Sequence, residues 1–496
     1  MTMIISYAIM RRELYSEMNG EKQMRKSGVL MPVASLPAAY MCGDFGPAAY
    51  TFADMLKENG FTYWQVLPLN PVGFGNSPYQ CYSSRALDEI YVSPELLYEE
   101  GMIAKLPRAK KTKTVDYTTA KALKRELLQE AFAGFKENAA FRKFAAQEWV
   151  RNYALFITFK EANGSCWNEW DDAYKNYPLD PQEELYAKHQ DELRYHIFAQ
   201  FVLHQQFTKL KNYLHKKGMK LFGDLPFYVG IDSDDVYFNR DCFTLDQDGR
   251  PTWIAGVPPD YFSETGQRWG NPLYDWDHLR ETDYAFWFDR LYYSSQLYDL
   301  IRVDHFRAFD TYWKIDAKEE TAVNGEWVIN TGDDFFARLY EKYPDIQIAA
   351  EDLGLIRPEV YELRDKYGLA GMHVLQFAFF EEAREHEIAY TGTHDNDALV
   401  TWFRSLDKAE QTKIRKLVKK QFPEEKIYTG ILAFALAMKS ELVILSVTDI
   451  LEDTRRINFP GTVGSPNWEY KIDRFDKLQE CLAYLKQFNI RFKRAR

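Results

Sequence analysis

The sequence predicts an α/β protein built as a (β/α)8 TIM barrel, and two observations carry this prediction. Eight apolar, β-leaning runs occur along the chain, and segments with helical spacing of apolar residues lie between several of them. Strand–helix alternation is typical of a parallel sheet covered by helices, and eight repeats of it are typical of a closed barrel. The runs are residues 28–36, 61–69, 220–229, 300–306, 346–353, 371–380, 388–396 and 441–450.

Five segments between these runs have the periodicity of helices that bury one face. They are residues 48–59, 284–298, 334–343, 358–367 and 408–420. Pro358 is predicted in the first turn of its helix, where a missing backbone N–H costs little.

Two irregularities modify the regular barrel. The second and third runs are separated by about 150 residues, and this stretch is rich in Ala, Lys, Glu and Leu. We therefore expect a large, mainly helical subdomain inserted at about 70–219, and further insertions on the catalytic face in a loop region at about 230–282. The link 381–387 is too short for a crossover helix of about a dozen residues, so one barrel helix is predicted to be missing or reduced.

We expect residues 24–496 to form one catalytic barrel and residues 1–23 to be a dispensable N-terminal extension. The apolar residues 3–10 lack the basic region and the small-residue cleavage site of a signal peptide. The basic tail, 491–496, is predicted to be solvated.

Composition excludes several classes of partner. The net charge of −11 argues against nucleic acid, and no run approaches the roughly 18 apolar residues of a membrane span. Five widely spaced cysteines without a CxxC pair favour reduced thiols and a cytoplasmic protein. Aromatic residues make up 16% of the chain, which fits either a large aromatic core or surfaces that bind sugar rings.

Three of the predicted strands pass from apolar residues to an acid. Asp304, Glu351 and Asp395 stand at the carboxyl ends of the fourth, fifth and seventh runs, so they should meet at the rim where barrel enzymes place their chemistry. Carboxylates gathered in one mouth repel one another, and at least one should hold a proton at neutral pH. Arg302 and Arg307 should keep Asp304 ionised. An ionised nucleophile beside a protonated acid is what glycoside chemistry requires.

A structural ion pair at a strand end remains an alternative interpretation of Asp304 and its arginines. His373 lies inside an apolar run and is expected to be a core histidine, and His305 could point behind the strand rather than toward a sugar.

Several blocks resemble one family. RVDHFR (302–307), AEDLG (350–354) and THDN (393–396) are similar to blocks of the α-amylase clan, and more closely to those of its amylomaltase, or 4-α-glucanotransferase, family. GDFG (43–46), WQVLPL (64–69), SPYQ (77–80), GDLP (223–226) and GVPPDYFSETGQRWGNP (256–272) resemble signatures specific to that family. The resemblance runs from about residue 28 to 468 in the same order.

The resemblance implies Asp304 as nucleophile, Glu351 as general acid/base and Asp395 as transition-state stabiliser. It also implies a set of substrate-binding residues: Ser77, Tyr79, Asp224, Tyr261, Phe262, Gln267, Trp269, Arg302, His394 and Asn396. The segment 261–267 matches a loop that arches over the cleft, and excluding water there would favour transfer over hydrolysis. No dense Asp/Asn loop resembles a calcium site, so we expect no required metal and no cofactor.

The predicted function is retaining transfer of α-1,4-glucan segments from a donor maltodextrin to the 4-hydroxyl of an acceptor glucan or glucose. The Asp304 and Glu351 carboxyl groups should lie about 5–5.5 Å apart, the spacing of retaining enzymes. A hydrolase using the same three acids stays an alternative, as does a non-catalytic glucan-binding protein. The expected partners are maltooligosaccharides, glucose and other α-1,4-glucans, and the expected oligomeric state is a monomer or homodimer.

Overall fold

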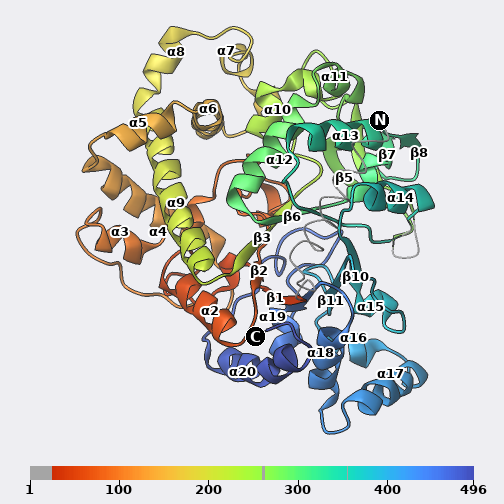
Figure 1. The fold of residues 1–496 in the computed structure, drawn as a ribbon. Coiled ribbons are helices and arrows are strands. Elements are labelled where there is room, and N and C mark those ends of the chain that lie inside the picture. The colour runs from red at the N-terminus through yellow and green to blue at the C-terminus, as the bar shows by residue number, and fades with distance from the viewer. Residues whose placement is uncertain (1–24, 260–262, 355, 496) are drawn as a thin grey trace.

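A computed structural model describes residues 25–259, 263–354 and 356–495. The predicted extension, residues 1–23, lies outside this described part. Eight parallel strands form one sheet in the order β10-β11-β12-β1-β2-β3-β6-β9. The sheet closes because Ala350 N–H donates to Ala370 O at 2.8 Å, which joins β9 to the residue preceding β10. The predicted barrel is confirmed, and Figure 1 shows it at the centre of the molecule.

Each barrel strand lies within one of the eight predicted runs or overlaps it closely. The strands are β1 (Lys26–Leu30), β2 (Tyr63–Gln65), β3 (Lys220–Leu225), β6 (Leu300–Val303), β9 (Ile348–Ala350), β10 (Gly371–Val374), β11 (Glu387–Tyr390) and β12 (Leu442–Ser446). Every residue of β9, β10 and β12 is buried. Burial on both faces explains why these strands read as continuous apolar runs rather than as alternating ones.

The five predicted helices are present with bounds shifted by two residues at most. They are α2 (Pro47–Glu58), α12 (Ala285–Leu297), α13 (Gly332–Lys342), α14 (Pro358–Lys366) and α17 (Lys408–Gln421). Pro358 stands in the first turn of α14, as expected. Asp407 caps α17 by accepting the N–H of Glu410 at 2.7 Å.

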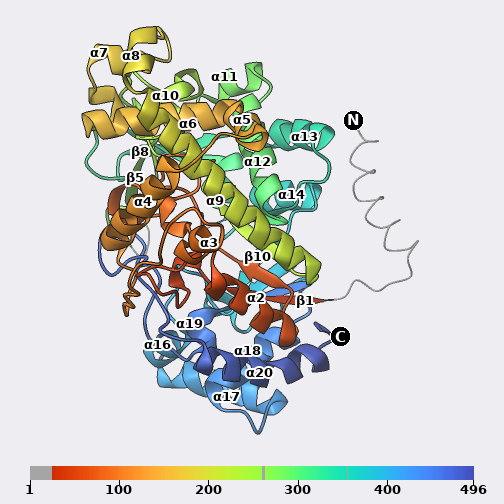
Figure 2. The ribbon, with the colours of Figure 1, turned by 90° about the vertical axis from the view of Figure 1, so that its left-hand side faces the viewer.

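The stretch between β2 and β3 is helical. It holds α3 (Pro94–Glu99), α4 (Tyr117–Ala133), α5 (Ala139–Ala145), α6 (Glu148–Asn163), α7 (Asp172–Lys175), α8 (Glu183–Lys188) and α9 (Gln190–Lys216). These helices, orange to yellow in Figures 1 and 2, gather on one side of the barrel. The long helix α9 then leads directly into β3.

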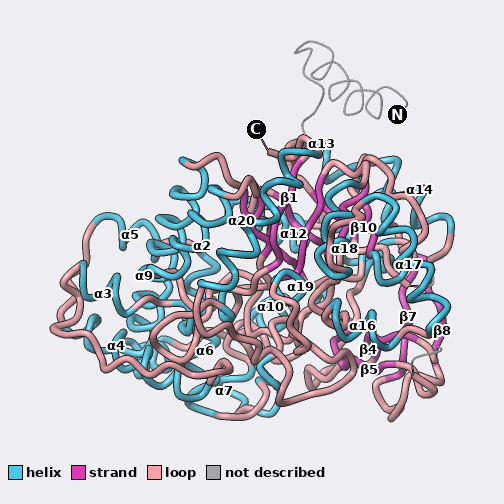
Figure 3. The backbone as a smooth tube through the Cα atoms, turned by 90° about the horizontal axis from the view of Figure 1, so that it is seen from below, coloured by secondary structure: helices cyan, strands magenta, loops and turns pink. Residues whose placement is uncertain are grey.

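A second sheet was not predicted. It has four antiparallel strands in the order β5-β4-β7-β8: β4 (Trp253–Val257), β5 (Gln267–Pro272), β7 (Thr311–Asp316) and β8 (Gly325–Ile329). β4 and β5 fall in the region expected to be an active-site loop, and β7 and β8 follow β6. Figure 3 shows this sheet standing apart from the barrel strands. Gly and Pro residues in β4, β5 and their connection hide the alternation that would have marked two strands.

The short link between the sixth and seventh barrel strands is confirmed as irregular. In the described part of this link the helix is α15 (Leu375–Ala378), a single turn. The remaining helices are α10 (Asp234–Phe238), α11 (Trp276–Glu281), α16 (Leu399–Ser405), α18 (Ile427–Ala437), α19 (Val447–Ile450) and α20 (Asp476–Arg491).

The prediction of a solvated basic tail is wrong for Arg494, which is fully buried with 0% of its surface exposed. Its guanidinium donates to four backbone carbonyls: Lys26, Leu436, Met438 and Ser440. These carbonyls belong to β1, to the end of α18 and to the residues that precede β12. The arginine therefore holds these elements together at the barrel end opposite the catalytic rim.

Among the described residues, no helix combines the length and the apolar character needed to cross a membrane.

Candidate active site

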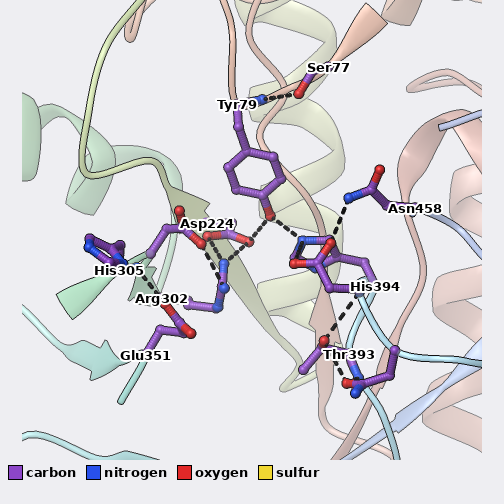
Figure 4. A network of polar contacts seen from close by, with 12 residues as sticks. Ser77, Tyr79, Asp224, Arg302, His305, Glu351, Thr393, His394 and Asn458 are labelled. Carbon is purple, nitrogen blue, oxygen red and sulfur yellow. Dashed lines mark hydrogen bonds and ion pairs between the residues drawn. The ribbon is translucent and has the colours of Figure 1, made fainter. Parts of the chain in front are cut away.

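Neighbouring strands β3 and β6 bring two carboxylates and one arginine together at the rim. Asp224 lies opposite Arg302 in the parallel register. Arg302 Nη1 donates to both carboxylate oxygens of Asp224 at 2.8 Å, and Nη2 donates to Asp304 Oδ1 at 2.8 Å (Figure 4). Gly223 precedes Asp224 because a Cβ at that position would lie 2.2 Å from the Tyr298 ring. The glycine therefore lets β3 pack closely against Tyr298 at the position just before Asp224.

Asp304 is the most exposed of these three side chains. Its side chain keeps 30% of its surface exposed, whereas the side chains of Arg302 and Asp224 are buried. Burial raises the pKa of Asp304 above its usual value, and the Arg302 guanidinium opposes this effect. The hydrogen bond to Arg302 also fixes one carboxylate oxygen and leaves the other for a reacting group.

Glu351 follows β9 directly and is held by the backbone after Asp304. His305 has a left-handed conformation with φ of 50°, uncommon for a residue that carries a Cβ, and its N–H donates to Glu351 Oε2 at 2.6 Å. Burial raises the pKa of Glu351 to about 7; the Asp304 charge adds to this, while Arg302 opposes it. Such a carboxyl group exchanges its proton near neutral pH, as a general acid and base must.

His394 and Asp395 stand in the turn after β11. His394 Nε2 lies 3.1 Å from Asp395 Oδ2, and Asn458 Nδ2 donates to Asp395 Oδ1 at 2.7 Å. Burial alone would raise the pKa of Asp395, but His394 and the Asn458 hydrogen bond outweigh it and hold that pKa below the usual range. Asp395 therefore stays ionised. In the same pair, burial lowers the pKa of His394, and Asp395 outweighs this and raises it.

Tyr79 joins the two halves of this network. Its hydroxyl donates to Asp224 Oδ2 at 2.8 Å and lies 3.0 Å from His394 Nε2. The Tyr79 and His394 rings are stacked with centroids 5.3 Å apart. Ser77 Oγ accepts the Tyr79 N–H at 3.3 Å, so the serine shapes the turn that carries the tyrosine. Figure 4 shows Tyr79 between Asp224 and His394, with dashed lines from its hydroxyl to both.

An aromatic side chain, Trp269, packs beside His305 near Glu351. Trp269, on β5, packs edge to face against His305 with ring centroids 4.8 Å apart. Its Nε1–H donates to Gln267 Oε1 at 3.2 Å. Two further predicted contacts, Tyr261 and Phe262, lie outside the described residues.

The family model described as 4-alpha-glucanotransferase matches residues 31–476. The chain belongs to this family. It is 37% identical over 471 residues to a 4-alpha-glucanotransferase of Aquifex aeolicus, covering 92% of this chain and 97% of the relative. It is 40% identical over 493 residues to a 4-alpha-glucanotransferase of Synechocystis, covering 93% of this chain and 97% of the relative.

Solved structures agree with these relatives. An amylomaltase from Streptococcus agalactiae in complex with acarbose is 34% identical and superposes with a TM-score of 0.89, covering 95% of this chain and 100% of that one. An amylomaltase from Corynebacterium glutamicum, 16% identical with a TM-score of 0.75, shows the same fold. The chain is therefore an enzyme, and its activity is that of its glucanotransferase family. The hydrolase alternative is not favoured.

Two of the predicted substrate contacts use polar atoms within the protein. Asn396 Oδ1 accepts both the N–H and the hydroxyl of Thr393 at 2.8 Å. This amide oxygen therefore stabilises the turn on which Asp395 lies. Ser77 holds the Tyr79 turn in the same way. Direct contact of either side chain with sugar stays a prediction.

The sequence did not single out three residues that hold the Asp395 turn. Arg456 donates to Asp395 O, and Asn458 binds the Asp395 carboxylate. Buried Asp449, after β12, accepts the Thr391 hydroxyl at 2.5 Å and the Leu399 N–H at 2.7 Å, one at each end of the turn.

Burial raises the pKa of Asp449 to about 6. An acid after the eighth strand was a readable signal, because it repeats the pattern of the other three. Nothing in the spacing of Arg456 and Asn458 pointed to the turn.

Proposed function

We propose that Asp304, Glu351 and Asp395 carry out retaining transfer between α-1,4-glucans through a covalent glycosyl-enzyme. Asp304 is the nucleophile, Glu351 the general acid and base, and Asp395 the carboxylate that stabilises the positive charge developing on the sugar ring. Two successive displacements at the anomeric carbon preserve its configuration.

In the first step Glu351 gives its proton to the glycosidic oxygen while Asp304 attacks the anomeric carbon. The leaving glucan departs with that proton, and Glu351 becomes a carboxylate. In the second step the 4-hydroxyl of an acceptor glucan attacks the anomeric carbon, Glu351 takes its proton, and the bond to Asp304 breaks. The carboxyl separation of about 5–5.5 Å that this scheme needs stays a prediction.

The observation that carries the assignment is the difference between the two acids. Glu351 has a pKa of about 7, with no arginine bonded to it among the contacts described. Asp304 is bonded to Arg302 at 2.8 Å. Glu351 is suited to hold a proton at neutral pH, whereas the Arg302 hydrogen bond favours the ionised form of Asp304 against the opposing effect of burial. Such different environments mark acid and nucleophile roles.

We assign the donor glucose to the pocket of Tyr79, Asp224 and His394. Arg302 is buried behind the two carboxylates, and its role is to orient Asp304 and Asp224. Trp269 and Gln267 would contact sugar on the Glu351 side, where aromatic faces suit the apolar faces of sugar rings.

The direct test is to incubate the purified enzyme with maltotriose and to follow free glucose and the oligosaccharide ladder. Products longer than maltotriose, with glucose, are expected. Asp304→Asn should abolish both while the far-UV circular dichroism spectrum is unchanged. Shorter products alone would mean that water is the acceptor, and substantial turnover by Asp304→Asn would overturn the nucleophile assignment.

Glucans are the substrates of this family, and we extend this to maltooligosaccharides as donors and to glucose as an acceptor. We also propose a cytoplasmic enzyme that binds neither nucleic acid nor membranes and is a monomer or homodimer. The net charge of −11 and the five cysteines, described without a disulfide, support this. Light scattering of the purified protein tests the oligomeric state.

A further inference from the structure

A half-exposed tryptophan on β8 has no place in the mechanism above. Trp327 keeps 42% of its surface exposed. It lies opposite Trp313 of β7, and the two rings pack edge to face with centroids 5.1 Å apart. Trp313 is buried and donates its Nε1–H to Ala322 O at 3.0 Å. Trp327 is therefore an exposed ring held on a rigid base.

Arg307 connects this ring to the active site. Its guanidinium lies 4.1 Å from the centre of the Trp327 ring, a cation–π contact. Arg307 belongs to the 3-10 turn Phe306–Phe309, which follows Asp304 at the end of β6. Burial lowers the pKa of Arg307, and the nearby carboxylates of Asp310 and Glu351 oppose that effect. Arg307 therefore lies near Glu351, on the turn that follows Asp304, and Trp327 stacks on Arg307.

The side of the cleft decides what this pair can bind. Figure 4 shows His305 and Glu351 on one side of Arg302 and Asp224, and His394 on the other. Glu351 protonates the leaving oxygen and later activates the entering hydroxyl, so the leaving and entering glucans must extend along its side. Trp269 borders that side through His305.

The chemistry of the pair suits a sugar chain. An indole ring offers an apolar surface to the C–H face of a pyranose, and a guanidinium offers several N–H donors to its hydroxyl groups. A pair made only to join two parts of the fold would not need to leave so much of the indole in contact with solvent.

We propose that Trp327 and Arg307 form an acceptor-binding surface for the glucose units of an α-1,4-glucan that follow the first. This inference rests on the proposed roles of Asp304 and Glu351. Such a surface would make the enzyme prefer longer acceptors to glucose, because a single glucose unit is too short to contact it.

The test separates donor from acceptor. A maltoheptaose derivative blocked at its non-reducing 4-hydroxyl serves as donor, since it cannot accept. Glucose and maltotriose serve as competing acceptors, and labelled transfer products are quantified. Trp327→Ala should raise the KM for maltotriose about tenfold and leave the KM for glucose unchanged, the loss of roughly 1.4 kcal/mol of acceptor binding. Trp327→Phe, which keeps a ring, should recover most of the loss.

The control is Tyr292→Ala on α12, which removes a ring of similar exposure, 46%, outside the active-site network. It should change neither KM. Arg307→Gln should also raise the KM for maltotriose, with a smaller effect on the KM for glucose. Thermal unfolding of every variant identifies damage to the second sheet.

Equal changes in the KM for both acceptors, or none, would overturn the inference. If the native enzyme transfers to maltotriose and Trp327→Ala does so equally well, only this inference fails. If the native enzyme gives no transfer product with either acceptor, the proposed function itself fails.

Discussion

The two ends of the barrel use burial in opposite ways. At the catalytic rim, Arg302 is buried between carboxylates, and the charged groups around it alter one another's pKa. At the other end, Arg494 is just as deeply buried, yet its guanidinium donates to four backbone carbonyls of β1, α18 and the segment before β12.

The difference lies in what the neighbouring groups can do. Backbone carbonyls do not titrate, so none of the Arg494 partners changes its charge, although burial and the nearby Arg25 charge lower the pKa of Arg494 itself to about 9. Carboxylates do titrate, and low dielectric surroundings strengthen their coupling. The rim therefore has reactivity at some cost in stability, while the opposite end contributes stability alone, which is the usual division in such barrels.

The largest effect is expected at the rim. Glu351→Gln should lower the rate on maltotriose by about 10²–10⁴-fold, the range for losing a general acid. An α-maltotriosyl fluoride donor should restore the first step, because fluoride leaves without protonation. In the native enzyme that first step should slow as pH rises through about 7, where Glu351 loses its proton.

The same variant should gain stability above pH 7. The folded-state pKa of Glu351 is above its unfolded value, so ionisation of this buried group opposes folding at higher pH, and a neutral amide removes that penalty. Loss of stability together with loss of activity would contradict the contrast between the two ends. Thermal unfolding at pH 6 and pH 8 measures it.

The next effect is expected at the opposite end and on stability only. Arg494→Ala removes the guanidinium donor from four carbonyls, of which Met438 O keeps a hydrogen bond from Arg25 Nη1 at 2.8 Å, and should lower the free energy of unfolding by about 3 kcal/mol. Below the unfolding temperature kcat should be unchanged. Arg474→Ala, at a side chain 81% exposed, is the matched control and should have no measurable effect on either. A fall in kcat for the folded variant would show that the two ends are coupled.

Asp449 is the intermediate case, because it is buried like Arg494 but holds a catalytic turn. Asp449→Asn replaces one acceptor by a donor that faces either Thr391 or Leu399. We expect kcat to fall about tenfold through a small displacement of Asp395, with little change in KM. Thr391→Val should act in the same direction, and the two changes should be less than additive in the double variant. If the two effects on kcat were fully additive, Asp449 and Thr391 would act independently, and the proposed joint role in holding the turn would be wrong.

The smallest effect concerns one hydrogen bond beside the Arg494 end. Ser27 Oγ donates to Asn489 Oδ1 at 2.7 Å, and both residues are buried. Ser27→Ala should cost about 1–2 kcal/mol of unfolding free energy, since the Asn489 amide oxygen loses its donor. Denaturant unfolding followed by fluorescence measures this, and unaltered maltotriose turnover is expected.

The barrel and the positions of Asp304, Glu351 and Asp395 could be predicted because their signals are local. A buried parallel strand is a continuous apolar run, and an acid at its end is adjacent in sequence. Asp224 and Arg302 were predicted as substrate contacts from the family resemblance, which did not show that they lie opposite each other on neighbouring strands or that Arg302 bonds to both Asp224 and Asp304.

What escaped prediction depends on partners distant in sequence. Arg494 looked like a solvated tail because its partners are backbone carbonyls, which leave no trace in side-chain composition. Asn458 reaches Asp395 across 63 residues, and no periodicity relates them. The left-handed backbone at His305, which directs its N–H toward Glu351, is uncommon for any residue with a Cβ, and no glycine marks it in the sequence.

The closure of the barrel also sets an order of events during synthesis. Lys26 O, in β1, accepts from Arg494, which lies 468 residues further along the chain. At a synthesis rate of roughly 5–20 residues per second, Arg494 is added about 20–90 s after β1. Until then one edge of β1 lacks β12, and an unpaired apolar strand is a site for association with other chains. This enzyme should therefore depend on chaperones more than a protein of equal stability built from local contacts.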